Sequence, residues 1–576
     1  MNKTKRLLAL FLALSMTLCA CSTSSSTDDS STNSSDSSSG TSTDEETSYV
    51  NPDGEFPIVD EQITLEVMAP SQTNIEDMET NTFTLYYEDL TNIHIDWNIV
   101  SEDSLSEKVS ISLSTNTMPD IYLACGITQT QQSVYGSQGA FVPLNDYVDE
   151  YGSTLQYMFD NIQNLESIMT MSDGNMYSLP KVTDVAHTYY PYKVWLNNEW
   201  LDNLGLEVPT TTEEFEAVLT AFDEYDANGN GDADDEIPFM SYNGGYNSTI
   251  FSGFIFNAFV YSPDDTNYVY LNDGEIQISY EQDGWLEAVT YLNDLYEQGL
   301  FYDQSFTLAK DMATQISTNS DGDLTVGAFT ASSPVNLLGA DSDLWSEYVA
   351  LSPLEGTQDA VSTWLAYSAI TTSFFVVTSE CEYPEAAFRW GVSFYDADIS
   401  FFSTHGVEGE NWALITPGEG DIPADATDVN TGAASQAEMY IDGGTYSDLQ
   451  NFCWRSLTLY CDSTTVTDLM YQEYLTGTYD DNIEIKLAYD TTDYLASYAP
   501  DIDTVLPTMV YTEEQSTALA TYETIIITYV EEMTTAFITG TISLDEWDSY
   551  IAELDNKGLQ ELKAIYQDAY DSKYGA

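Results

Sequence analysis

The clearest set of side chains able to do chemistry lies at residues 226–236, which read Asp-Ala-Asn-Gly-Asn-Gly-Asp-Ala-Asp-Asp-Glu. Oxygen-bearing side chains fall at positions 1, 3, 5, 7 and 9 of this loop, and glycine stands at position 6. That spacing wraps a chain around Ca²⁺, a hard cation that prefers carboxylate, amide and carbonyl oxygens. The loop therefore predicts a calcium site. Its role is structural, because no nucleophilic side chain flanks it.

The expected calcium ligands are carboxylate and amide side chains together with the backbone carbonyl of Asp232: Asp226, Asn228, Asn230, Asp232, Asp234 and Asp235. Asp235 would close the site, and Glu236 is the alternative closing ligand. An EF-hand has glutamate at position 12, whereas position 12 here is Ile237, followed by Pro238. The loop therefore starts like an EF-hand and finishes differently. The alternative interpretation is a solvated acidic turn in a very acidic chain.

The elements that lead into this loop have clear boundaries. Residues 198–204 predict a short helix that ends at Gly205, a residue suited to a left-handed cap. Thr211 and Glu214 have the spacing of a capping box at the start of the next helix. The core face of that helix is predicted at Phe215, Leu219 and Phe222. We expect these residues to be scaffold.

Nearer the N-terminus, the chain alternates between strand and helix. Strand patterns at 63–68, 93–100 and 119–123 are separated by helical patterns at about 82–90 and 104–114. This order predicts an α/β layer with a parallel sheet. Ligands of such sheets bind at the carboxyl ends of strands. The loops at 69–74 and 124–132 are therefore candidate ligand loops.

Length and composition exclude several classes of protein. The chain has 576 residues, 43% of them apolar, which is enough for two or more lobes with real cores. Thirteen Lys and Arg stand against 96 Asp and Glu, so the formal net charge is −83. Such a field repels phosphate backbones and excludes nucleic acid as a partner. The presence of only three histidines argues against a multi-histidine metal site.

The N-terminus predicts a lipoprotein. Residues 1–6 are basic, and the apolar run at 7–18 is shorter than the roughly 20 residues that span a bilayer. The sequence Leu18-Cys-Ala-Cys21 resembles the bacterial lipobox, so we predict a signal peptide at 1–20 and lipid attachment at Cys21. Ordinary cleavage with a free Cys21 is the alternative. Residues 21–56, rich in Ser, Thr and Asp, predict a disordered tether.

The body of the chain holds four further cysteines, namely Cys125, Cys381, Cys453 and Cys461. Four are few for this length, and none forms a CxxC pair. We therefore expect mostly free, buried thiols.

Several short motifs follow one another in a specific order: Gly139-Ala-Phe-Val-Pro-Leu-Asn-Asp, Asp173-Gly-Asn-Met-Tyr-Ser-Leu-Pro, the run from Val194 to Thr210, the calcium loop with Glu236-Ile-Pro, Leu295-Tyr-Glu-Gln-Gly-Leu, Tyr383-Pro-Glu-Ala-Ala-Phe-Arg-Trp and Gly406-Val-Glu-Gly-Glu-Asn-Trp. In this order they resemble the extracellular solute-binding proteins of carbohydrate ABC importers. The chain is most similar to the Gram-positive lipoprotein branch and to calcium-containing alginate-binding proteins. The match covers roughly residues 60–415. One departure is an extra acid before Ile237, which leaves the closing calcium ligand open.

The resemblance implies a type II periplasmic-binding-protein-like fold. It consists of two α/β lobes, each a mainly parallel sheet flanked by helices, with the ligand cleft between them. The expected boundaries are 57–185 for the first part of lobe 1, 186–360 for lobe 2 with the calcium loop, 361–435 for the return to lobe 1 and 436–576 for a hinge and a C-terminal helical part, mainly in lobe 2. Hinge closure would bury an oligosaccharide and present the closed form to the ABC permease subunits. We expect a monomer, lipid-anchored at the extracellular face of the cell membrane.

A sugar ligand calls for aromatic rings that pack on its C–H faces and for a few placed polar groups. The candidates lie after the expected strand crossing, in a glycine-rich loop and near the later tryptophans: Tyr189, Tyr190, Tyr192, Tyr242, Asn243, Tyr246, Trp364, Tyr367, Trp412 and Trp454. Core packing is the alternative for each of them. Lys181, Lys193 and Arg455 stand nearby and could meet a ligand anion, or form structural ion pairs. The negative field favours a neutral oligosaccharide over a uronate.

Three functions compete for this chain. The first is a binding lipoprotein without catalytic activity, for sugars or alternatively for peptides or other solutes. The second is a secreted carbohydrate-active hydrolase with paired carboxylates, but pairs among 96 acids prove nothing, and no nucleophile elbow, HExxH or P-loop is present. The third is an adhesion or scaffold protein, whose calcium loops usually repeat, whereas this loop occurs once. We expect the first.

Overall fold

The computed structural model describes residues 49–162, 164–184, 186–244, 253–263, 267–339, 342–367, 370–407, 410–415, 437–440, 449–462 and 483–575. The folded body begins at Tyr49. Arg389 is buried, and its Nη1 donates to the carbonyl oxygens of Asn51 and Pro52, both at 2.6 Å. A buried guanidinium needs such partners. Residues 49–56, which we expected in the tether, are therefore held on the body.

The first lobe is built on a six-stranded sheet in the order β14-β4-β11-β3-β1-β2. Its strands are β1 (Ile63–Pro70), β2 (Ile93–Val100), β3 (Ile121–Leu123), β4 (Leu179–Asp184), β11 (Ile370–Val377) and β14 (Tyr460–Asp462). β1 pairs with β2 and β3 in parallel, and β14 pairs with β4 in parallel. β11 runs antiparallel to both of its neighbours, β3 and β4.

The second lobe is built on a four-stranded sheet in the order β10-β5-β9-β6. Its strands are β5 (Val194–Asn197), β6 (Ile237–Met240), β9 (Val326–Thr330) and β10 (Tyr348–Ala350). Two hairpin-like pairs accompany the sheets: β7 (Val269–Asn272) with β8 (Glu275–Ile278), and β12 (Trp412–Ile415) with β13 (Ala437–Tyr440). Only β6 and β9 run parallel in this sheet, while β5 runs antiparallel to both β9 and β10.

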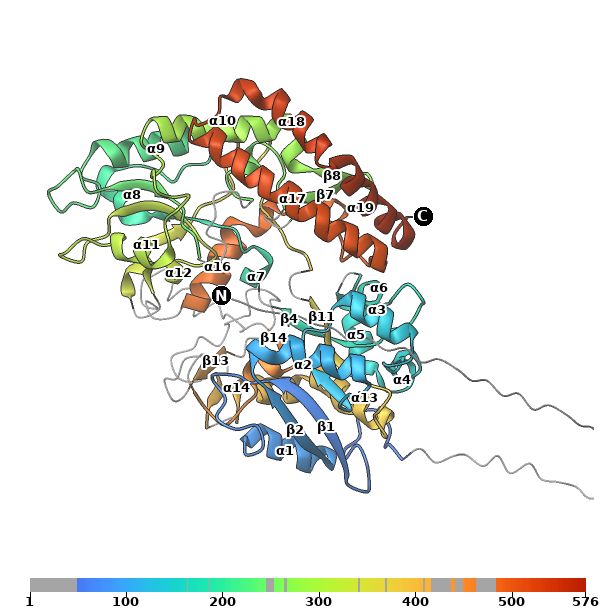
Figure 1. Ribbon diagram of the computed structural model, residues 1–576. Helices are drawn as coiled ribbons and strands as arrows, with labels where there is room; N and C mark the ends of the chain where they lie inside the picture. The colour runs from blue at the N-terminus through green and yellow to red at the C-terminus, as the bar shows by residue number, and fades with distance from the viewer. Residues whose placement is uncertain are drawn as a thin grey trace, which may run out of the picture. The chain divides into compact units, whose positions relative to one another are not determined.

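Helices flank both sheets (Figure 1). Those of the first lobe are α1 (Thr82–Thr91), α2 (Glu102–Thr115), α3 (Gln129–Ser137), α4 (Asn145–Tyr151), α5 (Ser153–Asn161), α6 (Leu165–Met169), α13 (Pro384–Val392) and α14 (Ala397–His405). Those of the second lobe are α7 (Ala186–Tyr189), α8 (Asn198–Leu204), α9 (Thr212–Glu224), α10 (Asp283–Glu297), α11 (Lys310–Ile316), α12 (Val335–Leu338), α16 (Ile483–Tyr494), α17 (Glu513–Ile538), α18 (Trp547–Asn556) and α19 (Leu559–Lys573). The long helix α17 packs against α10 and α19.

Each sheet separates two hydrophobic cores, because alternate residues of a strand point to opposite faces. In β1, Leu65 and Val67 belong to one core of the first lobe, and Met68 belongs to the other. In β5, Leu196 and Trp195 divide in the same way between the two cores of the second lobe. No core cluster of the described residues mixes the two sheets. Each lobe therefore has its own interior.

The predicted α/β class and two-lobe fold are confirmed. The expectation of a mainly parallel sheet in each lobe is wrong for the second sheet, where two of the three pairings are antiparallel. The reason is the chain path. β5 enters the second lobe from β4 of the other sheet and lies between β9 and β10, two strands formed much later in the chain, and it runs opposite to both.

Local predictions near the calcium loop largely hold. α8 ends at Gly205 with φ 65°, the predicted left-handed cap, and Phe215, Leu219 and Phe222 are buried in one core. Thr211 accepts from Glu214 N at 3.1 Å. The capping box is only half formed, because the Glu214 carboxylate accepts from Thr210 N instead of Thr211 N.

The cysteine prediction is confirmed for Cys125, Cys381 and Cys453, which are free and buried, while the side chain of Cys461 lies outside the description. Burial raises the pKa of the Cys125 and Cys381 thiols to about 12. Both thiols therefore stay protonated and inert at neutral pH. Among the described residues, no helix combines the length and the apolar character needed to cross a membrane.

Candidate functional site

The predicted calcium loop connects α9 to β6 at the edge of the second lobe (Figure 1). Gly229 and Gly231 have φ of 73° and 94°, a region that glycine enters without strain. Side-chain oxygens turn inward on the loop's own backbone. Gly231 N donates to Asp226 Oδ2 at 3.0 Å, and Asp232 N donates to Asn230 Oδ1 at 2.8 Å. Asp226 and Asn230 thus each hold a backbone amide of the loop, while Asn230, Asp232 and Asp234 are exposed.

Two buried carboxylate oxygens in this loop have no hydrogen-bond partner within the described part of the chain: Asp226 Oδ1 and Glu236 Oε2. The other oxygen of Glu236 accepts from Ala227 N at 2.9 Å, which holds the carboxylate against the start of the loop. Burial raises the pKa of Glu236. Unpartnered buried anionic oxygens are costly unless a cation meets them. The residues present therefore fit a bound Ca²⁺.

Asp235 and Glu236 are placed differently. Both oxygens of Asp235 accept from side-chain amides, Oδ1 from Asn228 at 3.1 Å and Oδ2 from Asn230 at 2.9 Å. Asn319, in the turn before β9, also reaches Asp235 Oδ2 at 3.4 Å. In the described part of the chain, no three carboxylate, imidazole or thiol groups converge on one point. The donor set of this loop instead mixes carboxylates with asparagine amides.

The aromatic residues predicted to bind the ligand are either half-buried at the margin of a core or fully buried. Tyr189 and Trp364 are half-buried at the margin of the same second-lobe core, and Leu365 N donates to Tyr189 O at 2.8 Å, so the two segments lie side by side. Tyr367 is half-buried, and its hydroxyl accepts from Asn164 Nδ2 at 2.9 Å. Tyr190 and Tyr192 are buried.

Other candidates are engaged elsewhere. Trp454 is fully enclosed in the first-lobe core, where its indole N–H donates to Thr84 Oγ1 at 2.8 Å. Tyr242 is buried in a second-lobe core. The Asn243 side chain donates to Phe306 O at 2.8 Å and so fastens a neighbouring loop. Tyr246, the Trp412 side chain and Cys21 lie outside the described residues.

A buried charged cluster lies beside residues 189–192, which we call the tyrosine segment. Lys486 Nζ and Asp490 Oδ2 form an ion pair at 2.9 Å, with 2% and 1% of the side chains exposed. Lys193 is also buried, and its Nζ donates to the carbonyl oxygens of Tyr190 and His187. Burial lowers the pKa of Lys193 to about 7, and Asp490 opposes that shift. Burial, aided by Lys193, lowers the pKa of His187 to about 4. Lys193 therefore holds the backbone of the tyrosine segment.

We expect this lysine to make stability depend on pH. Its pKa is about 7 in the folded chain against an ordinary 10.5, so between these values the unfolded chain binds more protons. The free energy of unfolding should then rise with pH across this window, by up to about 1.4 kcal/mol per pH unit. Lys193→Met should lose that rise, measured by urea unfolding at pH 7 and pH 9. Lys557→Met, at a partly exposed lysine of α18, is the control, and an equal slope in both variants would contradict the assignment.

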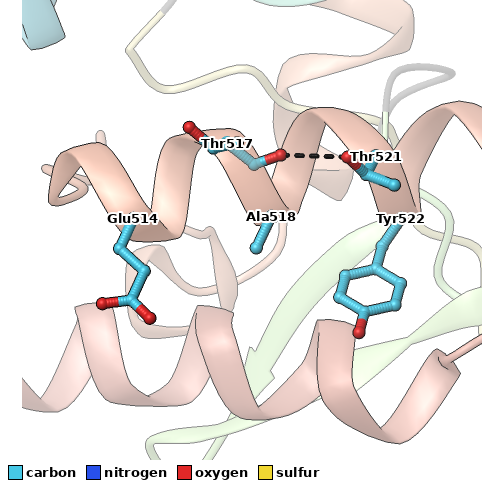
Figure 2. A pocket seen from close by; sticks show the side chains of 5 residues that line it. All are labelled: Glu514, Thr517, Ala518, Thr521 and Tyr522. Atoms are coloured by element: carbon cyan, nitrogen blue, oxygen red, sulfur yellow. Dashed lines mark hydrogen bonds between the residues drawn. The ribbon is translucent and has the colours of Figure 1, made fainter.

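A cavity of about 580 Å³ lies along α17 and is lined by Glu514, Thr517, Ala518, Thr521 and Tyr522. Figure 2 shows Glu514, Ala518 and Tyr522 on the same side of the helix, and Thr521 Oγ1 donates to Thr517 O at 3.1 Å. All five residues belong to one helix, and none of them is a predicted ligand residue. A sugar site needs groups that converge from several elements, so this cavity is not our candidate site.

Sequence reasoning missed a polar group in the first lobe. Gln129, Gln132 and Ser178 each keep a buried polar atom without a partner among the described residues. Gln132 Nε2 donates to the Ser373 hydroxyl, on a strand 241 residues away. The available signal was the expected ligand loop at 124–132, which leads into these two glutamines.

Comparisons with known proteins agree with this architecture. Residues 69–391, more than half of the chain, match the family described as bacterial extracellular solute-binding protein. The fructooligosaccharide ABC transporter substrate-binding protein FusA of Streptococcus pneumoniae is 25% identical over 522 residues, which cover 90% of this chain and 91% of FusA. The predicted family resemblance is confirmed.

Solved structures share the fold. FusA in complex with kestose, and an EF-hand mutant of FusA in complex with fructo-nystose, each give a TM-score of 0.65 at 24% identity, covering 88% of this chain and 99% of FusA. An extracellular solute-binding protein from Bifidobacterium longum subsp. infantis gives 0.70 at 20% identity, covering 89% and 98%. The alginate-binding protein AlgQ2, solved without calcium ion, gives 0.53 at 18% identity, covering 89% and 99%.

Proposed function

Because the chain belongs to the bacterial extracellular solute-binding protein family, we propose that it captures an oligosaccharide outside the cell membrane and delivers it to an ABC importer. The observation that carries this proposal is the relationship to FusA, which extends over nine-tenths of both chains. Two lobes with separate cores support a hinge mechanism, because each lobe can move as a rigid body when the ligand binds. The relatives are binding proteins, so we propose no catalytic step.

We propose that the ligand packs on the aromatic margin of the second lobe. Tyr189 and Trp364 lie side by side there and keep part of their rings exposed. Tyr190, Tyr192 and Tyr367 are the further candidates, with Tyr246 and the side chain of Trp412 outside the described part of the chain. The net charge of −83 favours a neutral sugar over a uronate.

The Trp364 ring gives a direct test of this margin. Trp364→Ala removes a flat apolar surface, so we expect the Kd for the bound oligosaccharide to rise at least tenfold, about 1.4 kcal/mol. Isothermal titration calorimetry measures this change. Tyr157→Ala, at a ring that is 64% exposed on α5, should leave Kd unchanged. Equal affinities of Trp364→Ala and the parent chain would remove this residue from the site.

We propose that Ca²⁺ binds the 226–236 loop and has a structural role. Side-chain oxygens of Asp226, Asn228, Asn230 and Asp234 and the carbonyl of Asp232 would hold it. The unpartnered oxygens of Asp226 and Glu236 favour Glu236 over Asp235 as the closing ligand. The EF-hand named for the FusA mutant supports the same chemistry in a relative.

We propose that Cys21 carries the lipid and that the chain works as a monomer at the extracellular face of the membrane, next to its permease. The lipobox-like Leu18-Cys-Ala-Cys21 supports the anchor. The tether would end at Tyr49, where the folded body begins. Cys21→Ser should abolish the incorporation of labelled palmitate into the protein, and incorporation equal to that of the parent chain would contradict the assignment.

The function is tested by a thermal-shift screen of residues 49–576 against neutral and acidic oligosaccharides. A ligand present at 100 times its Kd should stabilise the fold by about 2.7 kcal/mol. Stabilisation by neutral sugars alone supports the proposal. Stabilisation by peptides and by no sugar would reassign the ligand, and turnover of any sugar in the panel would overturn the binding-only role.

A further inference from the structure

A polar group in the first lobe lies where ligands of α/β sheets bind. Its members are Gln129 and Gln132 of α3 and Ser178, the residue before β4; we call them the α3 amide group. α3 begins five residues after the end of β3, so its first turn stands at the carboxyl end of that strand. Ala124 and Gly126 in the connecting loop both have positive φ, of 55° and 68°. The chain turns sharply here to place α3.

Packing brings these residues together. Gln129, Gln132 and Gly136 share one face of α3, at helical spacings of three and four. Gly136 packs on the Tyr177 ring so closely that an added Cβ would lie 2.5 Å from it. That contact presses the face onto the chain segment that holds Ser178. The pairing of Leu179 with Phe375 sets the same segment beside β11.

The central glutamine is fixed rather than mobile. Gln132 is 0% exposed, and its Nε2 donates to the Ser373 hydroxyl. Ser373 has φ 65°, and the pairing of β11 with β4 is interrupted around it, between Thr371 and Phe375. A non-glycine residue in that conformation is strained and needs support from its surroundings. The fold thus holds the Gln132 carboxamide in one orientation.

Three polar atoms of this group have no partner among the described residues: Gln132 Oε1, Gln129 Nε2 and Ser178 Oγ. One is an acceptor, one is a donor, and a hydroxyl can be either. Buried polar groups are nearly always satisfied by protein, water or ligand. The group is also uncharged, so it suits a neutral partner with hydroxyls that both donate and accept.

We propose that the α3 amide group is the first-lobe hydrogen-bonding subsite for adjacent hydroxyls of one neutral sugar residue. Gln132 Oε1 accepts from one hydroxyl, Gln129 Nε2 donates to the next, and Ser178 completes the contact. Thr130, between the two glutamines, contacts Ser516 of α17 at 3.2 Å, so this turn of α3 also meets the second lobe. The inference rests on the proposed function and adds the part of the sugar site that the first lobe contributes.

The test compares two substitutions in the mature chain. Gln132→Met keeps the volume of the side chain and removes the amide, and Gln138→Met does the same at the exposed end of α3. The probes are kestose and neutral tri- and tetrasaccharides of glucose, mannose and xylose, titrated calorimetrically, with Tm recorded without sugar. We expect Gln132→Met to raise the Kd of the sugar that binds by tenfold or more. Its sugar-free Tm should also fall, because the substitution removes the buried hydrogen bond to Ser373. The change in Kd, measured well below the Tm of both proteins, is therefore the readout of the subsite. Gln138→Met should change neither quantity.

The outcomes separate the two proposals. If the parent chain binds a sugar and Gln132→Met binds it within twofold as tightly, the subsite is wrong and the proposed function stands. If Gln132→Met lowers the Tm by the same amount with and without the sugar, the amide serves only the fold, and the subsite is again wrong. Gln129→Met is judged in the same way: an unchanged Kd for the sugar would remove Gln129 from the subsite. If the parent chain binds none of the sugars, the proposed function fails and the subsite fails with it.

Discussion

Asp490→Ala should lower the free energy of unfolding by about 3–5 kcal/mol. The substitution leaves Lys486 charged and 2% exposed, without the carboxylate that lies 2.9 Å from its Nζ. It also removes the negative charge that offsets the burial of Lys193. Without Asp490 the pKa of Lys193 should fall further below its ordinary value, so the main loss comes from the buried Lys486 side chain, which no longer has this carboxylate. Equilibrium unfolding in urea at pH 7 measures the loss.

The control is Asp548→Ala, at an exposed acid of α18, which should change stability by less than about 0.5 kcal/mol. The double variant Lys486→Met with Asp490→Leu should recover most of the loss, because replacing a buried pair by apolar residues is often neutral. A small effect of Asp490→Ala alone would mean that water reaches the cluster. Sugar affinity should also fall in that variant, since Lys193 holds the backbone of Tyr190.

Removal of Ca²⁺ should destabilise the chain by about 2.7 kcal/mol relative to protein in calcium at 100 times its Kd. For a lobe of roughly 150–250 residues this corresponds to a Tm change on the order of 5 °C or more. The physical reason is that the proposed ion would satisfy Asp226 Oδ1 and Glu236 Oε2, which the fold buries without a hydrogen-bond partner among the described residues. Differential scanning calorimetry of chelator-treated protein, with and without added calcium, measures the change.

Two neighbouring substitutions identify the closing ligand. Glu236→Gln should abolish most of the calcium-dependent Tm shift, whereas Asp235→Asn should keep a larger part of it, because Asp235 is engaged by the amides of Asn228 and Asn230. Asp223→Asn, an exposed acid on α9, is the control for the change in charge. The reverse order of the two variants would assign closure to Asp235. If added calcium does not change the Tm of chelator-treated protein, the loop is only an acidic turn.

Local pattern predicted several strands and helices well. β2 spans Ile93–Val100, the full predicted range, and its first half alternates as expected, with Ile93 and Ile95 buried and His94 and Asp96 exposed. Strand direction was harder to predict. β5 runs antiparallel to β9 because of the path that the chain takes through the second lobe. The four residues of β5 do not indicate that path.

The candidate ligand residues mark the limit of composition-based reasoning. Trp364 and Trp454 both stand in sequence near other aromatics and polar residues, yet one lies at the margin of a core and the other is wholly inside one. The difference arises from packing against Thr84, 370 residues away from Trp454. The presence of a tryptophan in the sequence therefore does not distinguish packing in the core from ligand binding.

The sequence by itself determined the features that depend on neighbours along the chain. These are the oxygen spacing of the 226–236 loop, the lipobox-like end of the apolar run at 7–18, the family motifs in their order and a net charge of −83. Only the tertiary structure decided which polar groups lose their water and what replaces it. Glu236 keeps an unpartnered oxygen while Asp235 does not, and Gln132 meets Ser373 across 241 residues. The physical reason is that desolvation and hydrogen-bond satisfaction depend on segments that become neighbours only on folding.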